Sequence, residues 1–150
     1  MENNSYNPFL AATRKVFQLM LDLSDVNERT ADGFSSVNGL DISIGVIGDL
    51  QGEIIYCFPR DTSLHIVRIM SGMEVDEVDD FVASAISEVA NIISGNVLTA
   101  LAAKDIKCDI LPPKPLQGAA SAARQLQAGY CITTPVGDVQ LDIRLRHAPK

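Results

Sequence analysis

The chain has 150 residues, 47% hydrophobic and 21% charged, which suits one globular domain and excludes disordered, collagenous and coiled-coil proteins. Its 12 basic and 19 acidic residues give a formal net charge of −7. A nucleic-acid-binding protein is therefore not expected, because such proteins neutralise phosphates with a basic surface. The basic residues at the end of the chain are better explained as a solvated strand edge and tail, and they are Arg144, Arg146, His147 and Lys150.

No segment has the character of a targeting signal or a membrane span. Residues 1–8 are polar and lack the apolar centre of a signal peptide. The longest uncharged stretch, residues 89–103, is too short and too polar to cross a bilayer. We therefore expect a cytoplasmic protein without membrane contact. Cys57, Cys108 and Cys131 form no C-x-x-C pair, so reduced thiols in strands are expected rather than a zinc site.

The first part of the chain is expected to form a helix and then a β-hairpin. Asn7-Pro8 is typical of a helix start, and apolar residues recur at helical spacing after it. Residues 24–38 are polar and irregular, which predicts a loop. Residues 40–48 alternate apolar and polar side chains, residues 49–52 suit a turn, and residues 53–58 follow as a second strand, so the pair is predicted to form a hairpin.

The second part of the chain is expected to contribute two helices and three strands. The pattern predicts a short helix over residues 63–70 and a long one over residues 76–103, whose acidic start complements the positive end of the helix dipole. A strand is expected over residues 106–111, and a helical turn is conceivable at 119–126. Residues 129–145 read as a closing hairpin. The order α-β-β-α-α-β-β-β predicts an α+β fold, a mostly antiparallel sheet with helices packed on it.

One face of the long predicted helix differs from an ordinary solvated surface. At 100° per residue, Ser84, Glu88, Asn91 and Gly95 fall within about 60° of one another, nearly opposite the apolar stripe. The stripe expected to face the core comprises Val78, Val82, Ala85, Val89, Ile92, Ile93 and Asn96. Residues 69–103 contain no basic side chain. One carboxylate and one carboxamide therefore project from a face of small residues, although a surface helix with small residues by chance is the alternative.

The chemistry open to a carboxylate and a carboxamide on one helix face is limited. They cannot form a nucleophile–base–orienter triad, and no Ser or Cys stands beside a His in the sequence. A carboxamide donates and accepts hydrogen bonds, so it can hold a water in line with a phosphorus atom. Phosphoryl transfer depends mainly on such positioning and on charge stabilisation. Because the sequence offers no metal or phosphate site, a partner would have to supply both.

These residues resemble the helix motif of the CheC/CheX family of chemotaxis phosphatases. The family pattern is Asp or Ser, three residues, Glu, two residues and Asn, matched here by Ser84, Glu88 and Asn91. A more distant Pro completes it, for which Pro113 and Pro115 are each one residue off the family spacing. Similar stretches extend over nearly the whole chain. Since only one Glu-x-x-Asn helix of this type occurs, CheX is the nearer group.

The resemblance implies that residues 1–150 form a single CheX-like phosphatase domain that dephosphorylates a CheY-type response regulator. It implies that Asn91 orients the hydrolytic water and that Glu88 pairs with the active-site lysine of the regulator. Ser84 and Gly95 would support the docking face. It further implies no cofactor of its own, Mg²⁺ held by the regulator, and a homodimer joined through the sheets.

Two other functions are compatible with the same residues. A non-catalytic adaptor could recognise a response regulator or another chemotaxis component through the same helix, and it would bind without accelerating phosphate loss. An independent small-molecule hydrolase is a weaker alternative, because neither a nucleophile nor a metal site of its own is evident.

Overall fold

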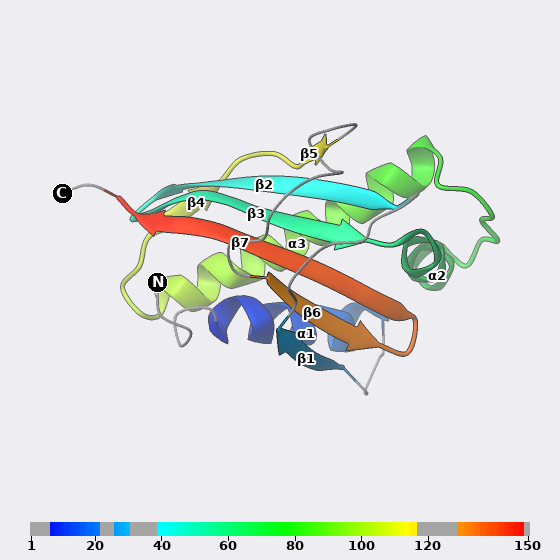
Figure 1. Ribbon diagram of the computed structural model, residues 1–150, viewed down its shortest axis with the longest axis horizontal. Helices are drawn as coiled ribbons and strands as arrows, with labels where there is room; N and C mark the ends of the chain where they lie inside the picture. Colours follow the sequence, from blue (N-terminus) through cyan, green and yellow to red (C-terminus); the bar gives the residue numbers. More distant parts are fainter. Residues whose placement is uncertain (1–6, 22–25, 31–38, 117–128, 149–150) are drawn as a thin grey trace.

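An antiparallel sheet with helices on one face forms the fold of this computed structural model, which describes residues 7–21, 26–30, 39–116 and 129–148 (Figure 1). In chain order the elements are α1 (Asn7–Leu21), β1 (Asn27–Thr30), β2 (Leu40–Gly48), β3 (Leu50–Phe58), α2 (Arg60–Ser71), α3 (Asp80–Ala102), β4 (Cys108–Ile110), β5 (Lys114–Leu116), β6 (Gly129–Thr134) and β7 (Gly137–His147). The strand order is β1-β6-β7-β3-β2-β4, and β5 also pairs with β2. The predicted α+β class is confirmed.

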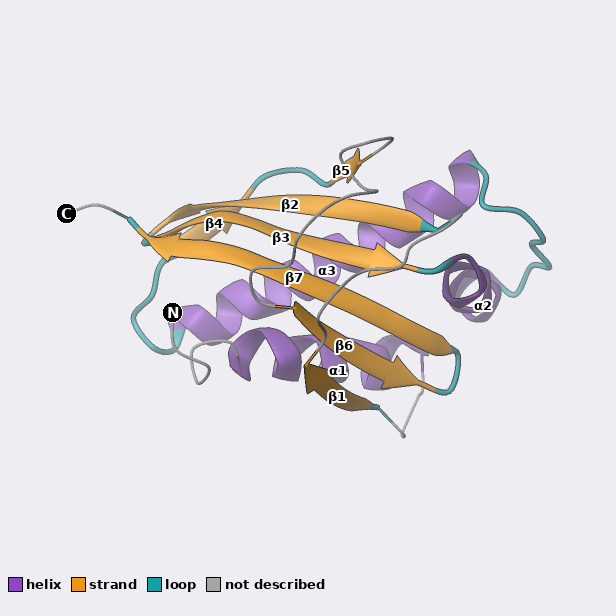
Figure 2. Cartoon of the chain, in the orientation of Figure 1, coloured by secondary structure: helices purple, strands orange, loops and turns teal. Residues whose placement is uncertain are grey.

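The central strands direct apolar side chains to one face of the sheet, which forms the main core. Ile42 and Ile44 of β2 lie opposite Tyr56 and Ile54 of β3, and Tyr56 in turn lies opposite Leu141 of β7. All five side chains are buried in the core. Because side chains of one strand face alternate sides of a sheet, this register produces a continuous apolar surface. Helices α1 and α3 cover that surface, and α2 lies at one end of the sheet (Figure 2).

Helix α3 is held against the sheet by its apolar side. Val82, Ile86 and Ile93 are fully buried, and Phe9 and Phe17 of α1 belong to the same core. By length and composition, α3 is also the one helix of the described ranges that could cross a membrane. Here it spans the core face of the sheet instead, with its buried residues following the helical period.

The long helix begins later than the acidic run predicts, at Asp80 rather than at residue 76. Side-chain contacts hold the preceding residues in a non-helical connection. Arg68 donates from Nε and Nη2 to the carbonyl oxygen of Val75, at 3.1 and 2.7 Å. Asp79 then accepts from the backbone N–H of Val82 at 3.0 Å, which is an N-cap that stabilises the first turn.

Two short strands are absent from the sequence prediction. Strand β1, within the predicted loop 24–38, pairs with β6 although its sequence NERT has no apolar alternation. Strand β5 contains Pro115 and pairs with β2 at the edge of the sheet, where a missing N–H is tolerated. The remaining strands and both hairpins are confirmed within a few residues. The helical turn considered at 119–126 lies outside the described residues.

Candidate functional site

The four residues of the candidate face lie on the side of α3 that points away from the sheet. Ser84 and Glu88 are exposed, and Asn91 and Gly95 are half-buried. On the opposite side, Ile86 and similar residues are fully buried. Because the helix is regular throughout this span, the four residues form one stripe along it. We call this stripe, Ser84–Glu88–Asn91–Gly95, the docking face.

The polar side chains of the docking face are uncommitted within the protein. Neither the Glu88 carboxylate nor the Asn91 carboxamide makes a hydrogen bond or ion pair within the described part of the chain. Asn96 contrasts with them: its Nδ2 donates to the carbonyl oxygen of Ile92 at 2.9 Å. Asn96 is half-buried rather than fully buried as the apolar stripe predicts. Of these two asparagines, Asn91 is the one whose carboxamide makes no hydrogen bond within the described residues.

Nothing among the described residues requires a glycine at position 95. A Cβ built on Gly95 meets no atom within 4 Å, and its backbone is helical rather than left-handed. Glycine inside a helix costs about 0.5–1 kcal/mol relative to alanine. Glycine at this position leaves the backbone bare on the side of α3 that points away from the sheet. A partner that approaches the helix closely would account for it.

An exposed aromatic side chain extends the docking face at its N-terminal end. Phe81 is 47% exposed and precedes Glu88 by seven residues, which places the two about 20° apart around the helix. Phe81 is not among the residues that the sequence pattern predicts for the site. An apolar residue at i−7 from the candidate catalytic Glu, outside the apolar stripe, is the signal that could have found it.

Beneath the docking face, a buried pair of hydroxyls joins α3 to the sheet. Tyr56 Oη and Ser94 Oγ lie 2.9 Å apart, and both residues are 0% exposed. Burial raises the pKa of the Tyr56 phenol well above its usual range, and the hydrogen bond to Ser94 opposes this shift more weakly. Ser94 follows Asn91 by three residues. The pair therefore fixes the helix against β3 next to the turn that carries Asn91.

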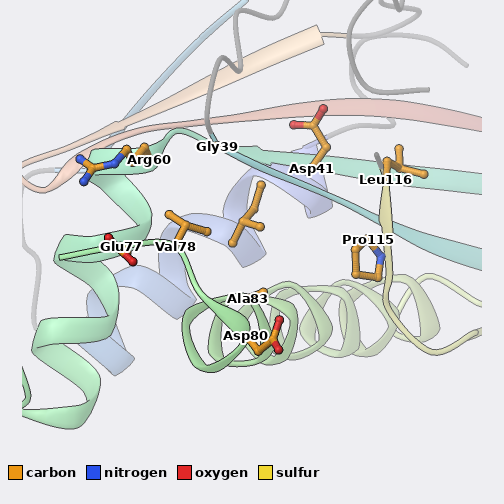
Figure 3. A pocket seen from close by; sticks show the side chains of 10 residues that line it. Gly39, Asp41, Arg60, Glu77, Val78, Asp80, Ala83, Pro115 and Leu116 are labelled. Carbon is orange, nitrogen blue, oxygen red and sulfur yellow. The ribbon is translucent and has the colours of Figure 1, made fainter. Parts of the chain in front are cut away.

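A cavity lies beside the start of α3, not on the docking face. It has a volume of about 680 Å³ and is lined by Asp80 and Ala83 of α3, Pro115 of β5, Asp41 and Arg60 among others. Figure 3 shows α3 on one side of it and β5 on another. Neither candidate catalytic residue lines it. Pro115, one of the two candidates for the motif proline, thus lies across this cavity from α3.

Metal-binding side chains are not gathered anywhere in the described ranges. No group of three or more His, Cys, Asp or Glu side chains in those ranges is placed to hold a metal ion. Cys57 and Cys131 are buried, Cys108 is half-buried, and no disulfide joins them. The candidate residues Glu88 and Asn91 lie on the outward surface of α3.

The comparison with protein families and curated proteins identifies similar sequences. The family model for "Chemotaxis phosphatase CheX" matches residues 42–136, more than half of the chain. The "CheY-P phosphatase CheX" of Thermotoga maritima is 30% identical over 110 residues, which cover 69% of this chain and 70% of that protein. The matched span includes the whole of α3 and its docking face.

Solved structures with the same fold extend the likeness to nearly the full chain. The crystal structure of the CheX–CheY–BeF3–Mg²⁺ complex from Borrelia burgdorferi contains a chain that is 28% identical, with a TM-score of 0.76. The match covers 93% of this chain and 96% of that one. A CheC-like superfamily protein from Shewanella sp. PV-4 has the same fold at 19% identity, with a TM-score of 0.78 and coverage of 97% and 99%.

Proposed function

Since this chain belongs to the CheX family of chemotaxis phosphatases, we propose that it removes phosphate from the aspartyl phosphate of a CheY-type response regulator. The T. maritima relative is named a CheY-P phosphatase, and the B. burgdorferi relative was crystallised with CheY, BeF3 and Mg²⁺. The observation that carries the proposal is the uncommitted carboxamide of Asn91 beside the exposed carboxylate of Glu88 on one stripe of α3.

Asn91 would act by positioning the attacking water. Its carboxamide can accept a hydrogen bond from the water through Oδ1 and donate another through Nδ2. In the reaction the oxygen of the water bonds to phosphorus, the bond from phosphorus to the aspartyl oxygen breaks, and the proton of the water leaves with inorganic phosphate. An amide is too weak a base to take that proton, so the contribution of Asn91 is orientation.

Glu88 would act on the partner rather than on the water. Its carboxylate lies one turn from Asn91 on the same stripe, where it can pair with a lysine of the regulator. The Mg²⁺ that neutralises the phosphate would be held by the regulator, so this chain needs no cofactor of its own. Ser84 and Gly95 are small enough to let the regulator approach the helix backbone.

The test follows phosphate loss from a CheY-type regulator of the same organism, phosphorylated in the presence of Mg²⁺. We expect the wild-type protein to accelerate the loss and Asn91→Ala to abolish the acceleration. Asn96→Ala is the matched control, because it removes the same group from the same helix where that group only bonds to Ile92. It should retain acceleration. Normal activity of the Asn91→Ala variant would contradict the mechanism.

The same assay separates the phosphatase from the adaptor alternative. An adaptor would bind the regulator through α3 without changing the rate of phosphate loss. Binding is measured with the regulator activated by beryllium fluoride and Mg²⁺, the state present in the B. burgdorferi complex. Binding without acceleration, found with several regulators, would replace the phosphatase by the adaptor.

Three further properties stay predictions. We propose that residues 1–150 act as a single phosphatase domain, that the chain forms a homodimer through its sheets, and that it resides in the cytoplasm. Light scattering on the purified chain gives the mass of the assembly and tests the dimer directly. Fractionation of cells tests the location.

A further inference from the structure

Phe81 is exposed where the other described phenylalanines are buried. Phe9, Phe17 and Phe58 are each 0% exposed, whereas Phe81 leaves 47% of its surface in water. An exposed phenyl ring adds nothing to the core and costs solubility. Large aromatic side chains of this kind are enriched among the residues that dominate the energetics of protein interfaces.

The position of Phe81 makes it continuous with the docking face. Phe81, Ser84 and Glu88 follow one another at spacings of three and four, so they are vertical neighbours on α3. Phe81 lies about 10 Å along the axis from Glu88. Helical side chains lean towards the N-terminus, so the ring extends the face beyond the first turn. The N-cap at Asp79 fixes that turn.

The surroundings of Phe81 are acidic, and the arginines nearest to it in the sequence are already hydrogen-bonded. Glu77, Asp79 and Asp80 are exposed next to it, and residues 69–103 contain no basic side chain. The nearest cations in the sequence are occupied: Arg60 donates from Nη2 to the carbonyl oxygen of Asp76 at 2.6 Å, and Arg68 donates to that of Val75. An apolar ring framed by carboxylates complements an apolar depression framed by lysine or arginine.

We propose that Phe81 is the aromatic anchor with which this chain docks its response regulator. The contact on the regulator would be an apolar depression with a cationic rim, beside the region that meets Glu88 and Asn91. The identity of the partner rests on the proposed function. The role of Phe81 is in affinity and choice of regulator, and it takes no part in the chemistry.

The experiment measures both docking and turnover for Phe81→Ala. Docking is the dissociation constant for the regulator activated by beryllium fluoride and Mg²⁺, and turnover is phosphate release at increasing regulator concentration. We expect the dissociation constant and KM to rise about tenfold or more, as for an interface anchor. At saturating regulator, kcat should change by less than about twofold. Alanine is a strong helix former, so α3 should remain folded.

Two further variants control the result. Phe81→Leu keeps part of the apolar surface and should restore part of the affinity. Ile47→Ala truncates a side chain of β2 with the same exposed fraction, 47%, on the sheet face opposite the helices, and should leave the dissociation constant unchanged. Affinity of Phe81→Ala within about twofold of wild type, or an equal loss for Ile47→Ala, would overturn the proposal.

The charged surroundings are tested separately. The double variant Glu77→Gln/Asp80→Asn should bind more slowly at low salt, and its association rate should depend less on salt than that of the wild type. An unchanged salt dependence would overturn the cationic rim.

The failure of this proposal is distinguishable from that of the phosphatase. If the wild type binds the regulator through Phe81 without accelerating phosphate loss, the anchor is supported and the phosphatase fails. If Asn91→Ala loses turnover while Phe81→Ala binds normally, the phosphatase is supported and the anchor fails.

Discussion

The hydrogen bond between Tyr56 and Ser94 offers a sharp test of how α3 is fixed to the sheet. Both hydroxyls are fully buried, 2.9 Å apart, and no other hydrogen bond is recorded for either of them in the described ranges. Removing one hydroxyl leaves the other in an apolar environment, whereas removing both leaves no unsatisfied group. The single variants Tyr56→Phe and Ser94→Ala and the double variant therefore form a complete cycle.

The expected free energies of unfolding follow from what each variant leaves behind. Ser94→Ala leaves the phenol of Tyr56 buried without a hydrogen-bond partner and should lower the free energy of unfolding by about 1–3 kcal/mol. Tyr56→Phe leaves a serine hydroxyl that can turn to the carbonyl oxygen of Ala90, one helical turn back, so about 0.5–1.5 kcal/mol is expected. The double variant should cost little more than Tyr56→Phe alone. The coupling between the two side chains is then about 1–2 kcal/mol.

Urea unfolding at neutral pH measures these values, with equal m-values as the condition for comparing them. Strictly additive costs would refute the coupling, and so would a Ser94→Ala variant as stable as the wild type. A second readout is the stability of the wild type at alkaline pH. Because burial raises the pKa of Tyr56 above 10.0, the folded state keeps a proton that the unfolded state loses.

The sign follows from this difference in bound protons. The contribution of Tyr56 is complete below pH 10 and is lost as the pH rises from there towards the folded-state pKa, with a slope of up to about 1.4 kcal/mol per pH unit. The Tyr56→Phe variant should lose less stability at alkaline pH, because it has no phenol there to deprotonate. An identical pH dependence in both proteins would contradict the assigned shift.

Two other variants test the docking face and the N-cap of α3. Gly95→Ala should stabilise the protein by about 0.5–1 kcal/mol, because an added Cβ meets no atom within 4 Å. The same variant should weaken binding of the activated regulator. Stronger binding would show that the bare backbone is not a contact. Asp79→Ala should lower the free energy of unfolding by about 1 kcal/mol through loss of the N-cap to Val82. Thermal unfolding of Asp79→Asn, which can still accept that hydrogen bond, provides the comparison.

The central fold could be predicted from the sequence because its signals are local. Ile42 and Ile44 alternate with polar residues in the manner of a half-buried strand, and the register of the hairpin follows from them. Strand β1 carries no such pattern. It forms by pairing with the edge of β6, and that edge cannot be recognised from the sequence of β1 itself. The start of α3 was misplaced because Arg68 holds the carbonyl oxygen of Val75, a contact between separate elements that no local pattern reports.

The candidate site could be predicted from the sequence only in part. The spacing of Glu88 and Asn91 can be read from the sequence itself, and the helical period places them on one face of the helix. The bond between Tyr56 and Ser94 joins residues 38 positions apart, so it emerges only when the helix is laid on the sheet. Phe81 was overlooked because an apolar residue near a helix start is ordinarily assigned to the core.

The groups proposed for the chemistry lie on the outside of α3, and neither Glu88 nor Asn91 lines the cavity beside the start of that helix. Under the proposed mechanism, no described part of this chain has to open for the reaction to begin, and no product has to leave an enclosed site on it. If phosphate is released in the site of the regulator, the step that ends each cycle is the parting of two folded proteins. The residence time of the regulator on α3 then sets the ceiling on throughput, so an interface tightened by engineering would yield a slower phosphatase.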